Sequence, residues 1–250
     1  MQLNPVEQFQ IHDMIPMVSM GGHNIAFTNS ALFMLIIVFL VSALLIGATA
    51  RRAIVPGRLQ SIAEMSYEFV ANTVRSSSGS EGMRFCPFVF TLFMFVLFAN
   101  LIGLIPFSFT VTSQLIVTAA LALTVFFLVI GYGFYRHGLH FLKLFVPSGV
   151  PGYILPAIVV IEVLSFLTRP LSHSVRLFAN MLAGHITLQV FAAFIIMLAG
   201  FGVVGWFGAV LPFAMVVVLF ALELLVAVLQ AYVFAILTCI YLNDAIHPGH

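Results

Sequence analysis

Long apolar stretches with almost no charge are the feature that most constrains how this chain can fold. Residues 31–50 form one such stretch, and a helix of about 20 apolar residues crosses the ~30 Å hydrocarbon core of a bilayer. Only 7% of the 250 residues are charged and 62% are hydrophobic, whereas soluble domains carry about 25% charged residues. A soluble chain of this size could not cover its surface with so few charges. The predicted fold class is therefore an all-α, polytopic integral membrane protein.

The apolar stretches predict a single membrane domain over residues 1–250 with about five membrane helices. After an outer N-terminal segment over 1–29, the membrane helices are expected over 30–50, 85–106, 111–135, 152–200 and 206–243. The last stretch would be roughly 55 Å long as a helix, so we expect the last two helices to be long and steeply tilted. Residues 57–75 carry a thin apolar stripe at helical spacing, which predicts an amphipathic interfacial helix.

The positive charges predict the orientation of these helices. Residues 1–29 contain no Lys or Arg, so the first apolar stretch lacks the positive region that comes before the apolar part of a signal peptide. We expect it to be an anchor with the N-terminus outside and the C-terminus inside. Five membrane segments then bring all cations of the connections to the inner side, as the positive-inside rule requires; they are Arg51, Arg52, Arg58, Arg75, Arg84, Arg136 and Lys143.

Arg176 lies in the middle of the fourth apolar stretch. A guanidinium stays protonated at any cellular pH, and a fixed cation at that depth costs at least ~2.5–3.5 kcal/mol. Other polar residues of this stretch recur at steps of seven, four and three, which return to the same face of a helix; the set is Glu162, Arg169, His173, Arg176, Asn180 and Thr187. This face cannot point to lipid, so we expect it to face protein or water.

The polar residues of the last two stretches have the chemistry that a proton path needs. Glu223 and Gln230 share a face of the last stretch, and His185 follows Gly184 in the fourth. Burial can bring Glu162, His185 and Glu223 to change protonation near neutral pH. Arg176 cannot release a proton but can hold a carboxylate ionised. Non-titrating side chains that can line such a path are Asn100, Asn180 and Gln230.

Structural roles remain open for several of these residues. Glu162 could pair with Arg169, His173 and His185 could be packed histidines, and Asn100 could satisfy a helix end. Gln230 could hydrogen-bond between helices, a common use of amides in membranes. No phosphate loop, GxSxG or HExxH motif is present, so we expect no enzyme activity from the chain on its own, no cofactor and no metal site.

Three sequence blocks resemble subunit a of the F-type ATP synthase, and the likeness extends over nearly the whole chain. The most specific block is LSHSVRLFANMLAGH at 171–185, and the others are NLIGLIP at 100–106 and ALELLVAVLQAYVF at 221–234. His185 follows the glycine and Glu223 lies on the last helix, which is the reverse of the commonest bacterial pattern. This exchanged order resembles alphaproteobacterial and mitochondrial members.

The resemblance implies a proton-translocating stator subunit with two offset half-channels against a rotating ring of subunit c. Arg176 matches the arginine that faces the ring carboxylate, and His185 and Glu223 match the pair of the outer half-channel. Glu162 matches the acid of the inner half-channel, and Asn180 and Gln230 match polar neighbours of the arginine. Our hypothesis adds Asn100 to the outer path and keeps His173 as a site candidate.

The expected partners are the c-ring, subunit b of the peripheral stalk, the rest of the F1Fo complex, lipids and protons, without nucleic acid. The expected location is a bacterial inner membrane, with the mitochondrial inner membrane as the alternative. A self-contained ion channel or transporter is the alternative function, although no paired inverted repeats are present. A membrane scaffold would instead tolerate alanine at Arg176, His185 and Glu223.

Overall fold

The computed structural model describes residues 10–11, 13–20, 23–50, 55–105, 108–146 and 153–247. The predicted inner cations Arg51 and Arg52, and Pro106 at the predicted end of the second membrane helix, lie outside the described residues. The first nine residues of the predicted outer segment and residues 147–152 also lie outside them.

The described chain is almost entirely helical, and the predicted all-α, polytopic membrane class is confirmed. Among the described residues, five helical segments are long and apolar enough to cross a membrane: Asn29–Ala50, Arg58–Gly103, which joins two of the helices below, Leu115–Leu142, Leu155–Ala199 and Val204–Ile246. The long helices are α1 (Asn29–Ala50), α2 (Arg58–Gly82), α3 (Cys86–Gly103), α4 (Leu115–His137), α5 (Leu155–Ala199) and α6 (Gly202–Ile246). Short 3₁₀ helices η2 (Met83–Phe85), η3 (Val111–Ser113) and η4 (Gly138–Phe145) lie between them.

Two local features differ from the sequence-based expectation. Strands β1 (Asp13–Met20) and β2 (His23–Thr28) pair antiparallel within the N-terminal segment. Helix α2 extends past residue 75, the end of the predicted interfacial helix, through the Ser- and Gly-rich stretch 76–82, and it kinks at Gly79, which leaves the helical conformation with φ 65° and ψ −163°. Glycine tolerates this left-handed conformation because it has no Cβ atom, so it allows the kink.

The chain forms two compact units, and each is assembled from three separate stretches. The first unit comprises Met1–Val41, Phe95–Gln114 and Leu177–Ala231, and the second comprises Ser42–Met94, Leu115–Arg176 and Tyr232–His250. The boundaries fall inside α1, α3, α5 and α6, so these four helices contribute to both units. A single membrane domain over 1–250 stays a prediction.

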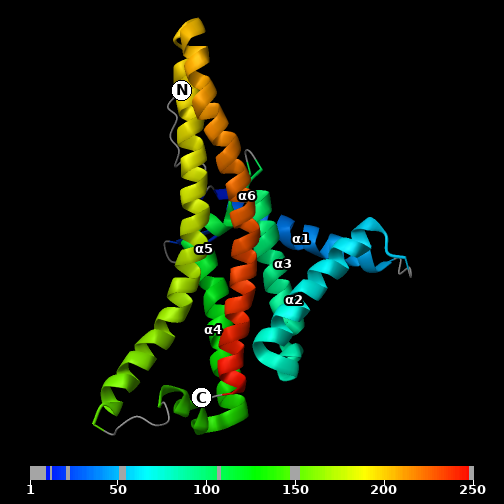
Figure 1. Ribbon diagram of the computed structural model, residues 1–250, viewed down its shortest axis with the longest axis vertical. Helices are drawn as coiled ribbons and strands as arrows, with labels where there is room; N and C mark the ends of the chain where they lie inside the picture. Colours follow the sequence, from blue (N-terminus) through cyan, green and yellow to red (C-terminus); the bar gives the residue numbers. More distant parts are fainter. Residues whose placement is uncertain are drawn as a thin grey trace. The chain divides into compact units, whose positions relative to one another are not determined.

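In the first unit, the second half of α5 and the first part of α6 run antiparallel side by side (Figure 1). The turn that joins them begins after Ala199, and Gly202 adopts φ 74°, a left-handed conformation that glycine tolerates best. Leu177 and Met181 of α5 and Ala227 and Ala231 of α6 are fully or almost fully buried. Small residues at these positions of α6 suit close helix packing in membranes.

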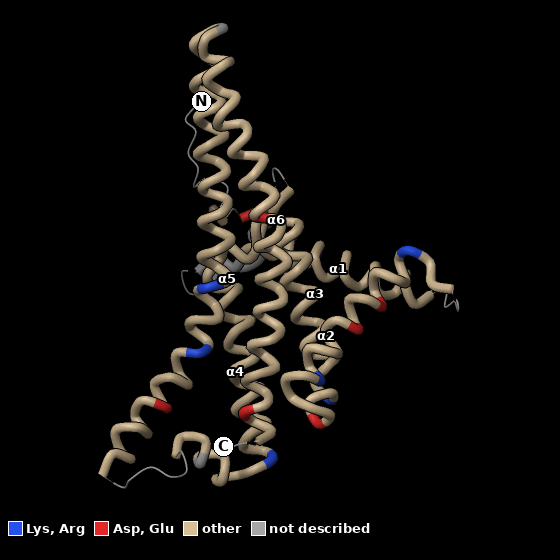
Figure 2. Tube along the Cα trace, viewed as in Figure 1, with Lys and Arg blue, Asp and Glu red and all other residues tan. Residues whose placement is uncertain are grey.

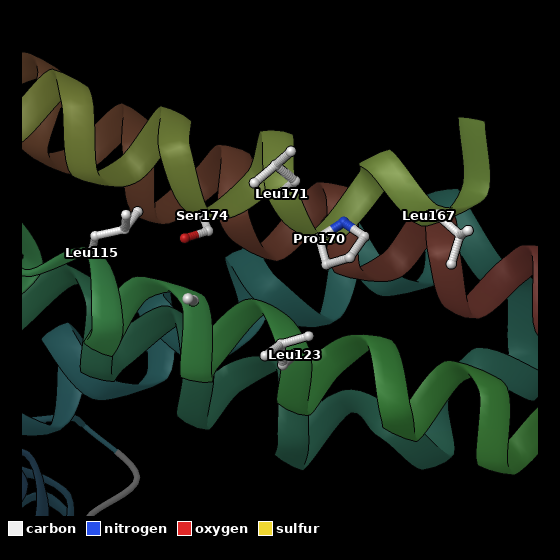
Figure 3. Close-up of a pocket in the computed structure, with 7 residues that line it drawn as sticks. Leu115, Leu123, Leu167, Pro170, Leu171 and Ser174 are labelled. Atoms are coloured by element: carbon white, nitrogen blue, oxygen red, sulfur yellow. The ribbon is translucent and has the colours of Figure 1, made fainter. Parts of the chain in front are cut away.

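In the second unit, α2, α3, α4, the first half of α5 and the end of α6 share a core. The Ser78 hydroxyl donates to the Cys239 carbonyl (2.8 Å), and the Thr118 and Ser174 hydroxyls are 3.1 Å apart. An open pocket of about 320 Å³ lies between α4 and α5, lined from α5 mainly by apolar side chains around Pro170 (Figure 3). Hydrogen bonds between helices therefore supplement an otherwise apolar core.

Candidate functional site

A buried histidine and a buried glutamate form the centre of the site in the first unit. Nε2 of His185, on α5, is 3.8 Å from Oε1 of Glu223, on α6. Their side chains are only 8% and 5% exposed. Neither carboxylate oxygen of Glu223 accepts a hydrogen bond from the described part of the chain. A buried carboxyl group without a hydrogen-bond donor is poorly stabilised as an anion, so it is suited to taking up a proton.

Thr110 is the hydrogen-bonding neighbour of this histidine. Its Oγ1 atom is 3.2 Å from Nε2 of His185 and 3.4 Å from the carbonyl oxygen of Gly103. A Cβ atom at Gly103 would lie 2.8 Å from Cγ2 of Thr110, closer than such carbons approach. Glycine at the end of α3 therefore makes room for Thr110 beside the imidazole ring.

Gly184 makes room for Glu223 in a similar way. A Cβ atom at this position would lie 2.5 Å from Oε1 of Glu223 and 3.0 Å from its carboxyl carbon. Any larger residue at 184 would push the carboxyl group away from its present position. The Gly184-His185 dipeptide thus supplies both the ring and the space for the acid that faces it.

Asn100 and Gln230 are buried in the same unit. The Asn100 side-chain amide donates to the carbonyl oxygen of Ala227 (3.1 Å), one helical turn after Glu223. Its Oδ1 atom has no hydrogen-bond partner among the described residues. The Asn100 amide thus links α3 to α6 rather than satisfying the end of its own helix. Its Oδ1 atom is a buried polar atom beside α6, the helix that carries Glu223.

An ion pair between helices characterises the second unit. Nη1 of Arg169, on α5, donates to Oδ2 of Asp244, on α6, at 2.5 Å. The guanidinium also lies over the rings of Phe166 and Tyr241, each 5.2 Å from its carbon. Arg169 pairs with Asp244 and not with Glu162 among the described residues. Glu162 is half-buried on the preceding turns of α5.

His173 lies in the core of the second unit. Its ring centroid is 3.9 Å from that of Phe234 and 6.0 Å from that of Tyr241. The residue is 3% exposed, and its Nε2 atom has no hydrogen-bond partner in the described part of the chain. Its main contacts are therefore aromatic packing.

Arg176 is exposed on α5, as are Asn180 and Thr187. The Arg176 guanidinium forms no hydrogen bond or ion pair with any described residue. From Leu177 to Leu222 the sequence contains no Lys, Arg, Asp or Glu, and the corresponding lengths of α5 and α6 are tan in Figure 2. Arg176 is thus a cation at the edge of a long uncharged stretch, and no described residue supplies an anion for it.

Sequence reasoning missed Thr110 and Asp244 as neighbours of the predicted residues. Asp244 lies 14 residues after Gln230 and shares its helix face, so spacing could have named it as a further acid of that face but not as the partner of Arg169. Thr110 gives no such signal, because it lies between helices and 75 residues before its partner His185.

Comparison with known proteins identifies relatives along the full chain. A sequence profile described as ATP synthase A chain matches residues 31–243. Proteins named ATP synthase subunit a are 64% identical to the chain in Rhodopseudomonas palustris and Nitrobacter winogradskyi over 248 residues, covering 99% of the chain and 100% of each relative. The corresponding protein of Xanthobacter autotrophicus is 64% identical over 250 residues, covering 100% of both chains.

The predicted resemblance is thereby confirmed, and a multi-pass apolar fold with buried ionisable residues agrees with it. The chain belongs to the ATP synthase A chain family, the membrane-embedded subunit a of the Fo sector of F-type ATP synthases.

Proposed function

We propose that this proton-translocating Fo subunit is a stator that forms two offset half-channels and exchanges protons with carboxylates of a rotating c-ring. A proton from the outer side passes Asn100, reaches His185 and Glu223, and protonates one ring carboxylate. The neutral carboxyl group then enters the lipid, because its desolvation penalty has fallen. After nearly a full turn, a ring carboxyl group releases its proton to the inner half-channel near Glu162.

The outer half-channel is supported by the buried His185–Glu223 pair. Two titratable groups 3.8 Å apart in an apolar unit can pass a proton after a small side-chain movement. The unpartnered Oδ1 atom of Asn100 and the buried amide of Gln230 add polar atoms in the same unit. Such atoms can hold water along a path that apolar side chains would otherwise keep dry.

The inner half-channel is supported by the charged residues of the second unit. Glu162 is half-buried on α5, and the guanidinium of Arg169 is already paired with Asp244. Because its nearest cation on the helix has another partner, the Glu162 carboxylate remains available to accept a proton. His173 contributes packing more than proton transfer, since aromatic rings cover it.

The exposed, unpartnered cation of Arg176 is the observation that carries the proposal. A fixed charge within a membrane-spanning helix requires an anion or water, and no described residue supplies the anion. A carboxylate on a neighbouring subunit satisfies this requirement and explains why the arginine is tolerated. The same cation repels protons, so it closes a direct path between the two half-channels. We propose the exposed amide of Asn180, four residues after Arg176 on α5, and the buried amide of Gln230 as further polar groups of the proton path.

The remaining proposals concern orientation and partners. The guanidinium groups of Arg84 and Arg136 both donate to the Tyr132 hydroxyl (3.1 and 3.3 Å), and Arg136 also pairs with Glu81. These cations therefore gather at one end of α3 and α4, which supports an inner location with the N-terminus outside and the C-terminus inside. We propose the bacterial inner membrane as the location, and the c-ring and subunit b as direct partners.

Replacing Arg176 by Ala tests the proposal in the complete ATP synthase reconstituted in liposomes. We expect coupled ATP synthesis to be abolished, while the matched Arg75→Ala variant, which removes an exposed arginine of α2, retains it. Near-normal synthesis in Arg176→Ala would contradict the assigned role. Proton flux through the isolated chain at rates close to those of the complex would instead favour a self-contained channel.

A further inference from the structure

We propose that Thr110 is a positioning residue of the His185–Glu223 site, whose hydroxyl group holds the imidazole ring in both of its protonation states. This inference rests on the proposed function, because it concerns proton transfer at the same pair. It begins from the fact that Nε2 of His185 faces two oxygens, Oγ1 of Thr110 at 3.2 Å and Oε1 of Glu223 at 3.8 Å. Only the first is within hydrogen-bond distance.

The Thr110 hydroxyl has two acceptors within reach and only one proton to donate. It can donate to the Gly103 carbonyl, 3.4 Å away, and accept a hydrogen bond from a protonated Nε2 of His185. Alternatively it can donate to Nε2 when that nitrogen carries no proton. Rotation of one C–O bond converts one arrangement into the other, so the ring can gain or lose a proton without moving.

The site is built so that this hydroxyl cannot turn to solvent. Thr110 is 0% exposed, and Gly103 leaves just enough space for its side chain. In the first unit, the charged group that faces His185 is Glu223 of α6, and residues 95–114 contain none. The hydroxyl oxygen and the carboxylate are therefore both favourable partners for a protonated imidazole here.

The two partners have different consequences for proton transfer. A hydrogen bond to Thr110 keeps Nε2 at 3.8 Å from Glu223, so the proton waits on the ring rather than forming a tight ion pair. A hydroxyl group that accepts from a charged imidazole stabilises the charged form more than the neutral one. Loss of this hydroxyl should therefore make His185 harder to protonate, and transport should require a higher proton concentration.

The test uses the complete ATP synthase in liposomes and measures ATP synthesis under a fixed potassium diffusion potential across a range of pH. In Thr110→Val, which keeps the shape but removes the hydroxyl, we expect the half-maximal rate to move to lower pH by roughly half to one unit. Thr110→Ser should restore the profile of the unmodified protein. The matched control is Thr112→Val, since Thr112 is equally buried on η3 and its hydroxyl has no partner among the described residues.

A second variant covers the case in which Thr110→Val does not assemble. Gly103→Ala places a Cβ atom 2.8 Å from Cγ2 of Thr110, which displaces the hydroxyl while keeping it, and it should shift the profile in the same direction. Identical profiles in Thr110→Val and Thr112→Val would overturn the inference, as would a Thr110→Ser profile that matches Thr110→Val. A His185→Ala variant with unchanged transport would instead refute the proposed function itself.

Discussion

The His185–Glu223 region and the Arg169–Asp244 region use ionisable residues of the same two helices in opposite ways. In the first, a carboxyl group is 5% exposed and accepts no hydrogen bond from the described chain. In the second, a carboxylate accepts a 2.5 Å hydrogen bond from a guanidinium that two aromatic rings also cover. One acid faces only a titratable imidazole, whereas the other is paired with a permanent cation.

This difference separates a proton-exchanging site from a permanently charged one. A buried carboxyl group without a hydrogen-bond donor or a fixed cation can carry a proton, and a titratable imidazole 3.8 Å away can exchange that proton with it. The Asp244 carboxylate is instead paired with a permanently charged guanidinium, and this pair links the two helices. We therefore infer that Glu223 exchanges protons, while Asp244 fixes α6 to the first half of α5.

The largest expected effect comes from removing the titrating oxygen of the first region. Glu223→Gln keeps the shape but cannot exchange a proton, and we expect ATP synthesis by the complex to fall by about 10²-fold or more. Asp244→Asn is the matched acid-to-amide change in the second region and should retain most of the transport per assembled complex. Equal losses in the two variants would remove the distinction between the regions.

A smaller effect is expected from crowding the same carboxyl group. Gly184→Ala would place a Cβ atom 2.5 Å from Oε1 of Glu223, so the acid must move away from His185. We expect a loss of transport of about tenfold, since a misplacement near 1 Å can reduce proton transfer strongly. Gly131→Ala is the control, because a Cβ atom there meets no atom within 4 Å. Unimpaired transport in Gly184→Ala would show that the observed approach is not required.

The two regions differ in how much of their structure the sequence could predict. The steps of seven and four residues predicted which residues share a face of α5 and α6, and the block at 171–185 led to the family. They could not predict the pair Arg169–Asp244, because seven-residue spacing within a helix does not show which residue of a second helix lies opposite. The same limit left Glu162 as a plausible partner of Arg169.

Contacts made by connecting segments were also beyond sequence reasoning. Thr110 reaches His185 from the segment between α3 and α4, where no periodic pattern indicates direction. The strands β1 and β2 and the continuation of α2 past residue 75 likewise depend on local hydrogen bonding, which hydropathy does not record. Periodicity therefore predicted the helices, and the sequence blocks predicted the family. The partner of each ionisable group could be found only from the structure.

The ion pair of the second region should matter more for stability than for transport. Asp244→Asn weakens a charge-assisted hydrogen bond between groups that are 21% and 25% exposed, so a loss of about 1–2 kcal/mol is expected. This loss should appear as a lower temperature of half-inactivation of the purified complex. The double change Arg169→Met with Asp244→Leu removes both charges and should recover part of the stability. A double variant less stable than Asp244→Asn would show that the unpaired guanidinium of Arg169 is not the main cause of the lost stability.

The smallest expected effect concerns a neutral hydrogen bond of the second region. The hydroxyl groups of Thr118 and Ser174 are buried and 3.1 Å apart, and Ser174 also lines the open pocket of about 320 Å³ between α4 and α5 (Figure 3). Interhelical hydrogen bonds in membranes contribute only about 0.6 kcal/mol on average, so Thr118→Val and Ser174→Ala should each lower the temperature of half-inactivation slightly. In a double-mutant cycle, the coupling energy should stay below about 1.7 kcal/mol. A coupling energy well above that value would show that this neutral hydrogen bond stabilises the second region more than expected. A loss of proton transport comparable to that of Glu223→Gln would show that the second region takes a direct part in transport and would break the comparison with the first region.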